Sequence, residues 1–304
     1  MKHYIIRRLL ATAVTLVGII VAAFFILRLA GDPTTALLGE SATPEDIARL
    51  RHLMGFDQPL WQQFTSFVWQ AAHGDFGTSF YYRLPAMSIV LERVPATFDL
   101  MLAAMAVTAA IAFPLGMVAA YRRGSFVDSA ATAIGAFGQA IPGFFLAILL
   151  IYAFSVKLKW LPAFGREDWR SYLMPAVVLA VYGAAPLIRL LRSTLQDVLT
   201  QDYIRTARAK GLSPAKVLLR HALRNALIPI VTLLGMQVGV LLGGSVITET
   251  VFAWPGMGRL LVQSIVQRDY PVVQAAVTLT GLVFLGINLF VDLLYGWIDP
   301  RIRY

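Results

Sequence analysis

Long uncharged runs of apolar residues follow one another along the chain. A helix needs about 20 such residues to cross the roughly 30 Å hydrocarbon core of a bilayer. Six runs approach that length, interrupted only by Gly, Pro, Ser, Thr, Gln and Asn, which membrane helices tolerate. They lie at about residues 9–27, 100–120, 130–156, 172–188, 226–248 and 271–291. The pattern predicts one all-α integral membrane domain, residues 1–304, with six transmembrane helices.

The composition agrees with this class, because 58% of the residues are hydrophobic and only 14% are charged, which is unusual for a soluble domain. The first run has a secretory signal as its alternative, since Lys2, Arg7 and Arg8 form a basic leader before it. The run is long for a signal, however, and residues 28–33 offer no small-x-small cleavage site. We therefore predict that it stays as an anchor.

The basic residues predict the orientation. With both termini inside, more than half of the 26 Lys and Arg residues fall in cytoplasmic segments, as the positive-inside rule requires. The basic segment 157–170, which this topology places outside, argues mildly against it. The net charge of +9 then reflects topology and contact with anionic lipid. No basic folded domain indicates nucleic-acid binding.

Residues that could carry chemistry are sparse. The sequence has no cysteine, which excludes disulfides, thiolate metal sites and cysteine nucleophiles. The histidines, His3, His52, His73 and His221, are too scattered for a metal-ligand spacing. No cluster of acid, base and nucleophile is evident either. We therefore predict no catalytic residues, no metal and no cofactor bound by this chain.

The connection at residues 29–99 is too long to be a simple turn. A helix is predicted from Thr43 to Met54, with Thr43 as the N-cap and Pro44 in the first position. A second helix is predicted at residues 59–72, whose Trp and Phe side chains suit a membrane interface. The topology makes this segment a long external loop that forms a small cap. The alternative is a loop with short helices but no binding partner.

The connection at residues 189–225 lies in the cytoplasm in this topology. Its central text, residues 202–229, is DYIRTARAKGLSPAKVLLRHALRNALIP. Tyr203, Ile204 and Ala207 share one face at helical spacing. The segment is therefore predicted to contain a short helix.

A second short helix is predicted directly after the first. Gly211 is placed to end the first helix in a left-handed conformation. Ser213 is placed to cap the next one, with Pro214 in its first turn. Two short helices joined by a glycine turn are thus expected to project into the cytoplasm. A basic amphipathic segment lying on anionic lipid is the alternative.

These residues carry a family resemblance. The segment resembles the EAA loop of bacterial ABC importer permeases, in the form typical of the dipeptide, oligopeptide, nickel and glutathione branch. Other motifs resemble the same branch, in the expected order, along nearly the whole chain. They are AGDP at 30–33, MGFDQPLWQQF at 54–64, GDFGTS at 74–79, ERVPATFDL at 92–100, GGSVITETVFAWPGMGRLL at 243–261, RDYPVVQA at 268–275 and the closing DLLYGWIDPRIRY.

The loop departs from the general permease signature in one respect. Counted back from Gly211, the signature's Glu and first Ala fall on Arg205 and Thr206, and only Ala207 matches. The peptide branch shares this substitution. The proline expected further along falls on Arg224, which leaves the extent of the second helix open.

The resemblance implies partners that carry out the ATP chemistry. The sequence has no G-x-x-x-x-G-K-[ST] phosphate loop, so ATP and Mg are expected on two separate ATPase subunits, and the chain is not expected to be an enzyme. The helix at residues 203–211 would sit in a groove of an ATPase, where the small Ala207 permits close seating, and Ala207 and Gly211 are expected to matter most. The coupling residues implied are Tyr203, Arg205, Thr206, Ala207, Arg208 and Gly211.

The resemblance also implies a second permease subunit that is a different chain, a periplasmic substrate-binding protein and the bacterial inner membrane as the location. In the fifth run Gly235, Gly239 and Gly243 recur at every fourth residue, a pattern that lets helices approach closely in lipid. The contact they make is either within the chain or with the second permease.

Polar groups inside the membrane should face protein or water. Gln139 and Gln237 are therefore candidates for lining the translocation path. Glu249 and Phe252 open a second external element, followed by a short helix predicted at residues 257–267. The resemblance makes this element part of an outer gate or of a docking surface, with a purely structural turn as the alternative.

A self-contained secondary transporter or channel is the alternative from another class. It would need coupling ions or a filter within its spans, yet the runs contain no ionisable residue before Asp292 and no evident inverted repeat. The resemblance favours di- and oligopeptides as substrates. Nickel chelates, glutathione, opines and oligosaccharides stay open, as does a homodimeric permease pair.

Overall fold

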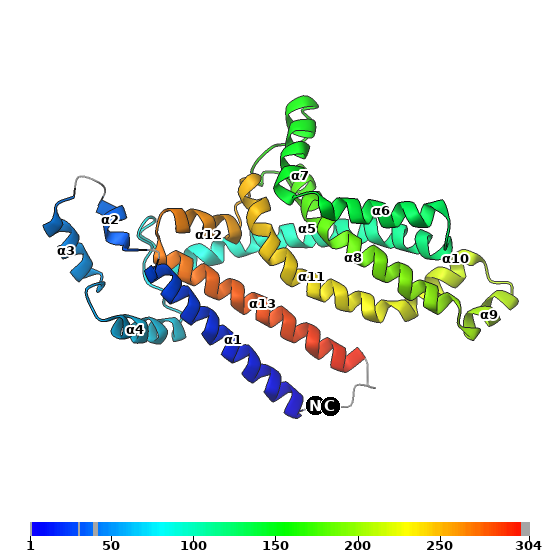
Figure 1. Ribbon diagram of the computed structural model, residues 1–304, viewed down its shortest axis with the longest axis horizontal. Coiled ribbons are helices and arrows are strands. Elements are labelled where there is room, and N and C mark those ends of the chain that lie inside the picture. Colours follow the sequence, from blue (N-terminus) through cyan, green and yellow to red (C-terminus); the bar gives the residue numbers. More distant parts are fainter. Residues whose placement is uncertain (1, 30, 39–41, 299–304) are drawn as a thin grey trace. The chain divides into compact units, whose positions relative to one another are not determined.

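A computed structural model describes residues 2–29, 31–38 and 42–298 (Figure 1). Helices account for most of these residues, and no strand occurs among them beyond an isolated bridge between Thr78 and Pro85. The prediction of an all-α protein is confirmed. The chain divides into two compact units. Unit 1 is formed by Met1–Thr97 and Pro255–Leu289, and unit 2 by Phe98–Trp254 and Phe290–Arg303.

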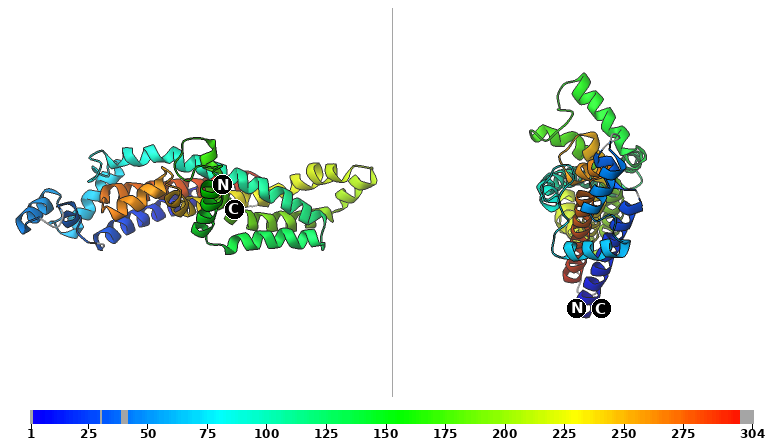
Figure 2. Two further views of the ribbon diagram at one scale, coloured as in Figure 1. Left: turned by 90° about the horizontal axis from the view of Figure 1, so that it is seen from above. Right: turned by 90° about the vertical axis from the view of Figure 1, so that its left-hand side faces the viewer.

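Unit 1 combines the two ends of the sequence. Its helices are α1 (Lys2–Leu29), α2 (Pro33–Leu38), α3 (Pro44–Leu53), α4 (Leu60–Ala72), the start of α5 (Ala86–Tyr121), α12 (Met257–Val266) and most of α13 (Tyr270–Ile298). Helices α1 and α13 lie side by side (Figures 1 and 2). Gly281 permits this approach, because a Cβ there would come within 2.9 Å of Ile19. Phe24 of α1, Val90 of α5 and Val272 of α13 are fully buried in the core of this unit.

The cap helices of unit 1 agree with their sequence signals. At the start of α3, the backbone N–H of Asp46 donates to Oγ1 of Thr43 at 3.2 Å, and the Thr43 N–H donates back to the Asp46 carboxylate at 3.4 Å. This reciprocal capping box satisfies two backbone donors, and Pro44 occupies the first turn. The helices predicted at residues 43–54 and 59–72 are both confirmed, with slightly shorter bounds.

Polar contacts gather three distant segments at one end of unit 1. Asp269, fully buried between α12 and α13, accepts hydrogen bonds from Ser79 Oγ and from the Phe80 N–H at 3.1 Å. The Tyr270 hydroxyl donates to the Gly31 carbonyl at 2.5 Å. The segment after α1, the segment before α5 and the turn into α13 therefore meet, and all three belong to parts predicted to be external.

Unit 2 is built around one long helix. Its elements are the rest of α5, α6 (Phe126–Ala140), α7 (Gly143–Leu150), the π-helix η1 (Ile151–Lys157), the 3-10 helix η2 (Trp169–Tyr172), α8 (Leu173–Leu199), α9 (Asp202–Ala209), α10 (Pro214–Lys216), the π-helix η3 (Val217–Ala222) and α11 (Leu223–Val251). Leu187, Leu191 and Leu195 of α8 have no exposed surface. Gly116 brings α5 against α8, since a Cβ there would lie 2.7 Å from Leu191.

Four helices within the described residues are long and apolar enough to cross a membrane. They are Ile6–Leu29, Ala86–Tyr121, Trp169–Leu199 and Tyr270–Val291. Two helix pairs qualify only when each is counted as one bent span. They are Phe126–Ala140 with Gly143–Lys157, bent by 98°, and Pro214–Leu227 with Pro229–Gly243, bent by 57°. The third and fifth predicted runs therefore fall on bent pairs and not on straight helices.

Proline accounts for both bends. Ile141 adopts an extended conformation, with φ −85° and ψ 123°, because the ring of the following Pro142 disfavours helix at the preceding residue. Pro229 lies inside α11, where it has no N–H to donate and its ring crowds the preceding turn. Uncharged runs thus reveal apolar length but not whether that length is straight, since Pro186 lies inside α8 and that helix still qualifies as a single span.

We expect the Asp269→Asn variant of the full chain to unfold at a lower temperature than the parent. An amide would replace one acceptor oxygen and leave a buried donor unpaired, at a cost of about 1–3 kcal/mol. Thermal unfolding of the purified protein in detergent measures the change. Asp57→Asn is the control, since the ion pair of Asp57 with His52 lies on the surface, where a pair contributes little. Equal unfolding temperatures for both variants would contradict this role of Asp269.

Candidate functional site

The loop between α8 and α11 lies at the end of unit 2 that also holds the turn between α5 and α6 (Figure 1). At this end Arg192 of α8 makes a two-pronged ion pair with the buried Asp128 of α6, and its Nη2 donates at 2.8 Å. The Gly124 N–H donates to the same carboxylate at 3.0 Å. The two connections predicted to be cytoplasmic therefore lie at one end of unit 2.

The inner face of α9 packs against the helices of unit 2. Ile204 is fully buried and Ala207 is only 6% exposed. Both belong to an apolar cluster with Leu195 of α8, Val217 of η3 and Ala222 at the end of η3. Since burial of apolar surface outside the bilayer is favourable, these contacts hold α9 on the ends of α8 and α11.

A glycine ends α9 as predicted. Gly211 has φ +75°, the left-handed conformation that glycine adopts without steric cost. Its N–H donates to the Arg208 carbonyl at 2.9 Å, and the Leu212 N–H donates to the Ala207 carbonyl at 3.4 Å. This pair of bonds is a Schellman motif. Ser213 and Pro214 then start α10 in the predicted positions, but the Ser213 side chain makes no capping hydrogen bond.

The outer face of α9 is polar and exposed. Arg205, Thr206 and Arg208 lie on it, and Arg205 approaches Asp202 at 3.6 Å. Tyr203 is 42% exposed at the edge, where its hydroxyl accepts a hydrogen bond from Asn225 Nδ2 at 2.8 Å. A cavity of about 480 Å³ lies beside this face, lined by Tyr121, Leu199, Arg208, Leu212, Pro214 and Val217.

The position of Ala207 corrects one expectation. Close seating of Ala207 against an ATPase requires an exposed side chain, whereas its methyl group packs into the chain's own apolar cluster. The periodicity placed Tyr203, Ile204 and Ala207 on one face correctly, and that face turns inward. Ala209, two residues further along, is exposed.

The glycine stripe of α11 serves different contacts at its two ends. A Cβ at Gly235 would lie 2.5 Å from Val291 of α13, so this glycine makes room for an intrachain contact. Gly239 is partly exposed. Gly243 is exposed, and a Cβ there would meet nothing within 4 Å. The stripe therefore packs against the chain itself at Gly235 and is unpacked at Gly243.

The four path or gate candidates do not converge. Gln237 is buried and donates to the Gly183 carbonyl at 2.7 Å, which ties α11 to α8. Glu249 and Phe252 are buried as well, and Phe252 packs in an apolar cluster of unit 2. Gln139 alone of the four is exposed, and it lies near Arg189, whose Nη2 donates to it at 3.4 Å.

Solved structures share this fold. A chain of the inward-facing MetNI methionine ABC transporter matches with a TM-score of 0.54 and 22% identity, covering 72% of this chain and 98% of that chain. A chain of an amino acid ABC transporter crystallised with histidines matches with a TM-score of 0.50 and 14% identity, covering 68% and 93%. The fold is thus one found among chains of ABC transporters.

Sequence comparison is more specific. Residues 112–304 match the binding-protein-dependent transport system inner membrane component, and residues 1–101 match the N-terminal region of such membrane components. The glutathione transport system permease protein GsiC of Escherichia coli strain K12 is 44% identical over 305 residues, 100% of both chains. GsiC of Shigella flexneri serotype 5b is 43% identical over the same lengths. The chain belongs to the family of binding-protein-dependent transport system inner membrane components, and it is a permease subunit of an ABC importer.

Ala207 and Ala209 form a matched pair for testing which face of α9 points inward. We expect Ala207→Asp to detach α9 from its apolar cluster and to speed up amide exchange in the loop. The new carboxylate would enter that cluster at a cost of a few kcal/mol. Ala209→Asp places the same charge on the exposed side and should leave the loop folded. Hydrogen–deuterium exchange of peptides covering residues 202–216 separates the two outcomes. Equal protection in both variants would show that Ala207 does not hold α9 in place.

Proposed function

We propose that this permease subunit conducts small peptides, of the size of dipeptides or glutathione, across the bacterial inner membrane. The observation that carries the proposal is the 44% identity, over the whole length, to a glutathione permease. The chain also has a helix, α9, whose inner face is buried and whose outer face is charged. The name of that relative supports a peptide cargo. Nickel chelates, opines and oligosaccharides are the alternative cargoes of the same transporter class.

The proposed route of force starts at α9. Exposed Arg205 and Arg208 meet acidic groups at the edge of a groove in a separate ATPase subunit, since charge complementarity orients such contacts. Ile204 and Ala207 pass the displacement to α8 and α11, because a close-packed apolar contact moves as a unit. Gly211 and Tyr203 support this role by fixing the end and the edge of the helix.

The proposal places six spans in the membrane, each bent pair crossing once, with both termini in the cytoplasm. The clustering of residues 31–38, 79–82 and 268–270 at one end of unit 1 supports a common external side for these segments. A periplasmic binding protein docks on that side. A second permease subunit completes the path, and the open end of the glycine stripe at Gly243 supports a contact there. Gln139 is the path candidate that its exposure favours.

ATP and Mg bind to two ATPase subunits and not to this chain in the proposed assembly. The sequence lacks a phosphate-binding loop, which supports this division of work. Membrane lipid contacts the basic cytoplasmic segments, whose charge suits anionic headgroups.

The topology is testable by labelling, because the chain has no native cysteine. We expect a cysteine at Ser66 to react with a membrane-impermeant maleimide added from the periplasm, since α4 belongs to the external cap. A cysteine at Ser213 should react only after the cells are opened. Both serines are exposed, so burial within the protein would not prevent either cysteine from reacting. The reverse pattern would overturn the orientation.

The coupling role is testable by reversing charges on the outer face of α9. In proteoliposomes that contain the complete transporter and its binding protein, we expect Arg205→Glu combined with Arg208→Glu to reduce peptide uptake at least about tenfold, through lost charge complementarity. ATP hydrolysis should either continue without peptide uptake, or decrease because less of the ATPase associates with the permease. Neither side chain is buried, so membrane levels should be normal.

The control is Arg220→Glu, which reverses an exposed charge in the same loop outside α9. Normal uptake in this control is expected. Equal loss in both variants would indicate that the loop acts as a lipid-surface segment.

Two further measurements test the cargo and the division of work. Uptake of labelled glutathione, a dipeptide and a nickel chelate by the parent transporter identifies the cargo. The purified chain alone should not bind ATP.

A further inference from the structure

Unit 1 contains a cavity of about 260 Å³ at the base of the cap, between α1, the α3–α4 turn, α4 and the start of α13. Both apolar and polar side chains line it, and Arg28 is the one charged residue among the described residues that do so. Four glutamines also line it, Gln58, Gln63, Gln70 and Gln274. A pocket with one cation and several neutral hydrogen-bonding groups is suited to a ligand with one negative charge and amide-like polarity.

Aromatic rings hold the guanidinium of Arg28 in place. Its carbon lies 4.4 Å from the ring centre of Phe56, 5.0 Å from that of Phe24 and 5.7 Å from that of Tyr270. Cation–π contacts of this kind use the flat guanidinium and leave its N–H groups for acceptors. Among the described residues the enclosed Nε has no hydrogen-bond partner, so the terminal nitrogens are the donors left for a ligand in the cavity.

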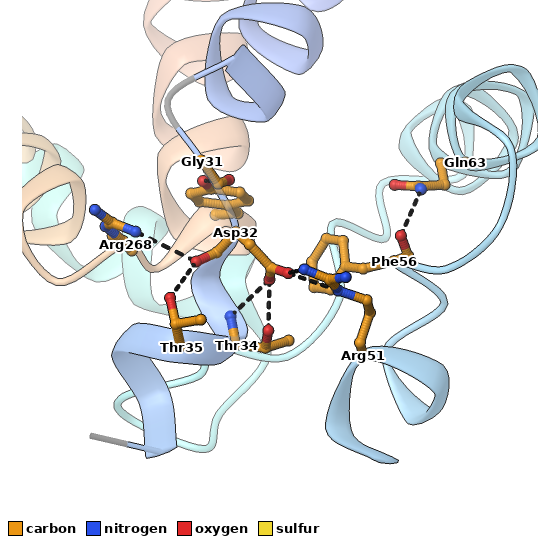
Figure 3. Close-up of polar contacts among 9 residues, drawn as sticks. Gly31, Asp32, Thr34, Thr35, Arg51, Phe56, Gln63 and Arg268 are labelled. Carbon is orange, nitrogen blue, oxygen red and sulfur yellow. Dashed lines mark hydrogen bonds and ion pairs between the residues drawn. The ribbon is translucent and has the colours of Figure 1, made fainter. Parts of the chain in front are cut away.

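The acidic residue closest in sequence to Arg28 is already engaged. The Asp32 carboxylate accepts hydrogen bonds from the Thr34 N–H at 2.9 Å, the Thr34 hydroxyl at 2.6 Å and the Arg51 Nε at 2.7 Å (Figure 3). Burial alone would raise the pKa of Asp32, but the bonds from Thr34 and Arg51 outweigh it and hold the pKa below its usual range. Asp32 is therefore ionised and committed elsewhere, and it makes no ion pair with Arg28.

Gln274 supplies a second, independent indication of a ligand. Its side chain is only 6% exposed and lines the cavity. No hydrogen bond joins it to any residue in the described part of the chain. Neither polar atom of this amide is fully enclosed, so both remain available to a ligand in the cavity. Gln63 donates through Nε2 to the Gln58 carbonyl at 2.8 Å and to the Phe56 carbonyl (Figure 3). Its enclosed Oε1 has no hydrogen-bond partner within the described residues, so this oxygen is an acceptor left for a donor group of a ligand.

We propose that this cavity binds the carboxylate of a small ligand of amino-acid to dipeptide size, with Arg28 receiving the carboxylate and Gln274 a neighbouring amide or amine. The planar fork of a guanidinium matches a carboxylate in two parallel hydrogen bonds. The volume lies below the roughly 300–1,000 Å³ of drug-sized sites, which limits the ligand to this size. The site lies in unit 1. Its ligand belongs to the cargo class of the proposed function, so the inference deepens that function and rests on it.

Calorimetry with the full chain in phosphatidylcholine nanodiscs tests the site without any mutation. The probes are dialanine and dialanine amide, which differ only in the carboxylate. We expect saturable binding of dialanine and binding at least about tenfold weaker for the amide, a difference of about 1.4 kcal/mol. Equal affinities, or no saturable binding of dialanine, would overturn the proposal.

Variants then locate the binding. Arg28→Gln removes the cation, and Gln274→Glu adds a repelling charge while keeping the size of the side chain, so both should abolish dialanine binding. Arg49→Gln is the matched control, because Arg49 is exposed on α3 and does not line the cavity. If Arg28→Gln does not fold, Gln274→Glu still decides the question. Unchanged binding in Gln274→Glu would place dialanine elsewhere and refute the site.

Two further arms separate the sources of an anion. Inorganic phosphate, titrated in place of dialanine, should bind more weakly. A guanidinium pairs with phosphate as well as with carboxylate, but phosphate offers no amide or amine to Gln274. Nanodiscs containing phosphatidylglycerol should leave dialanine binding intact. Binding of phosphate but not of dialanine, or loss of dialanine binding in the anionic nanodiscs, would assign the cavity to a lipid headgroup and overturn the carboxylate proposal.

Discussion

Helices inside a bilayer gain little by covering each other's apolar side chains, because lipid tails are equally apolar. Cohesion in unit 2 therefore depends on close backbone approach. Gly116 lets α5 reach Leu191 of α8, and Gly183 leaves room for Gln237 of α11, whose amide donates to the Gly183 carbonyl. A side chain at either glycine would push a helix away. Helix α8 is thus held by α5 and α11, and this fixes the frame from which the loop projects.

Where the chain leaves the bilayer, a different kind of cohesion takes over. Water is present there, so burying Ile204 and Ala207 is favourable at roughly 25 cal/mol per Å² of apolar surface. The same boundary is where charges can pair with less loss of hydration, and Arg192 meets Asp128 there. This end of unit 2 therefore combines hydrophobic burial with an ion pair, whereas the interior of unit 2 depends on the close fit of its helices. Such a loop can be held firmly and still present a charged outer face.

Local signals in the sequence predicted the features that depend on a few neighbouring residues. The Thr43 capping box, the left-handed Gly211 and the lengths of the apolar runs are of this kind, since each is decided within one or two helical turns. The inner face of α9 was predictable as a face but not as an inward one. Periodicity says which residues lie together, and only the packing of α8 and η3 shows that Ala207 turns toward the chain.

Contacts between distant segments were out of reach of the sequence. Ser125 and Asp128 have the spacing of a helix start, which could have marked the beginning of α6, yet nothing local pairs Asp128 with Arg192, 64 residues later. Asp269 and Ser79 are separated by 190 residues. The break before Pro142 was missed for another reason: membrane helices tolerate proline, so its presence does not say whether a helix continues or turns.

The connection between α9 and α11 favours a tilt of the first turns of α11 over a push along the axis of that helix. Between α10 and α11 the chain forms the π-helix η3, and Pro229 follows inside α11, where the axis bends by 57°. Asn225 lies between them and donates to the Tyr203 hydroxyl at 2.8 Å and to the His221 carbonyl at 3.1 Å. The first turns of α11 are therefore bound to α9, while the missing hydrogen bond at Pro229 weakens the ladder beyond them. We infer that a displaced α9 carries these turns with it and changes the angle at Pro229. A permease whose path opens alternately to two sides needs a change of angle. Helix α11 already bends at its proline, whereas α8 also contains a proline, Pro186, and still qualifies as a single span without a bend.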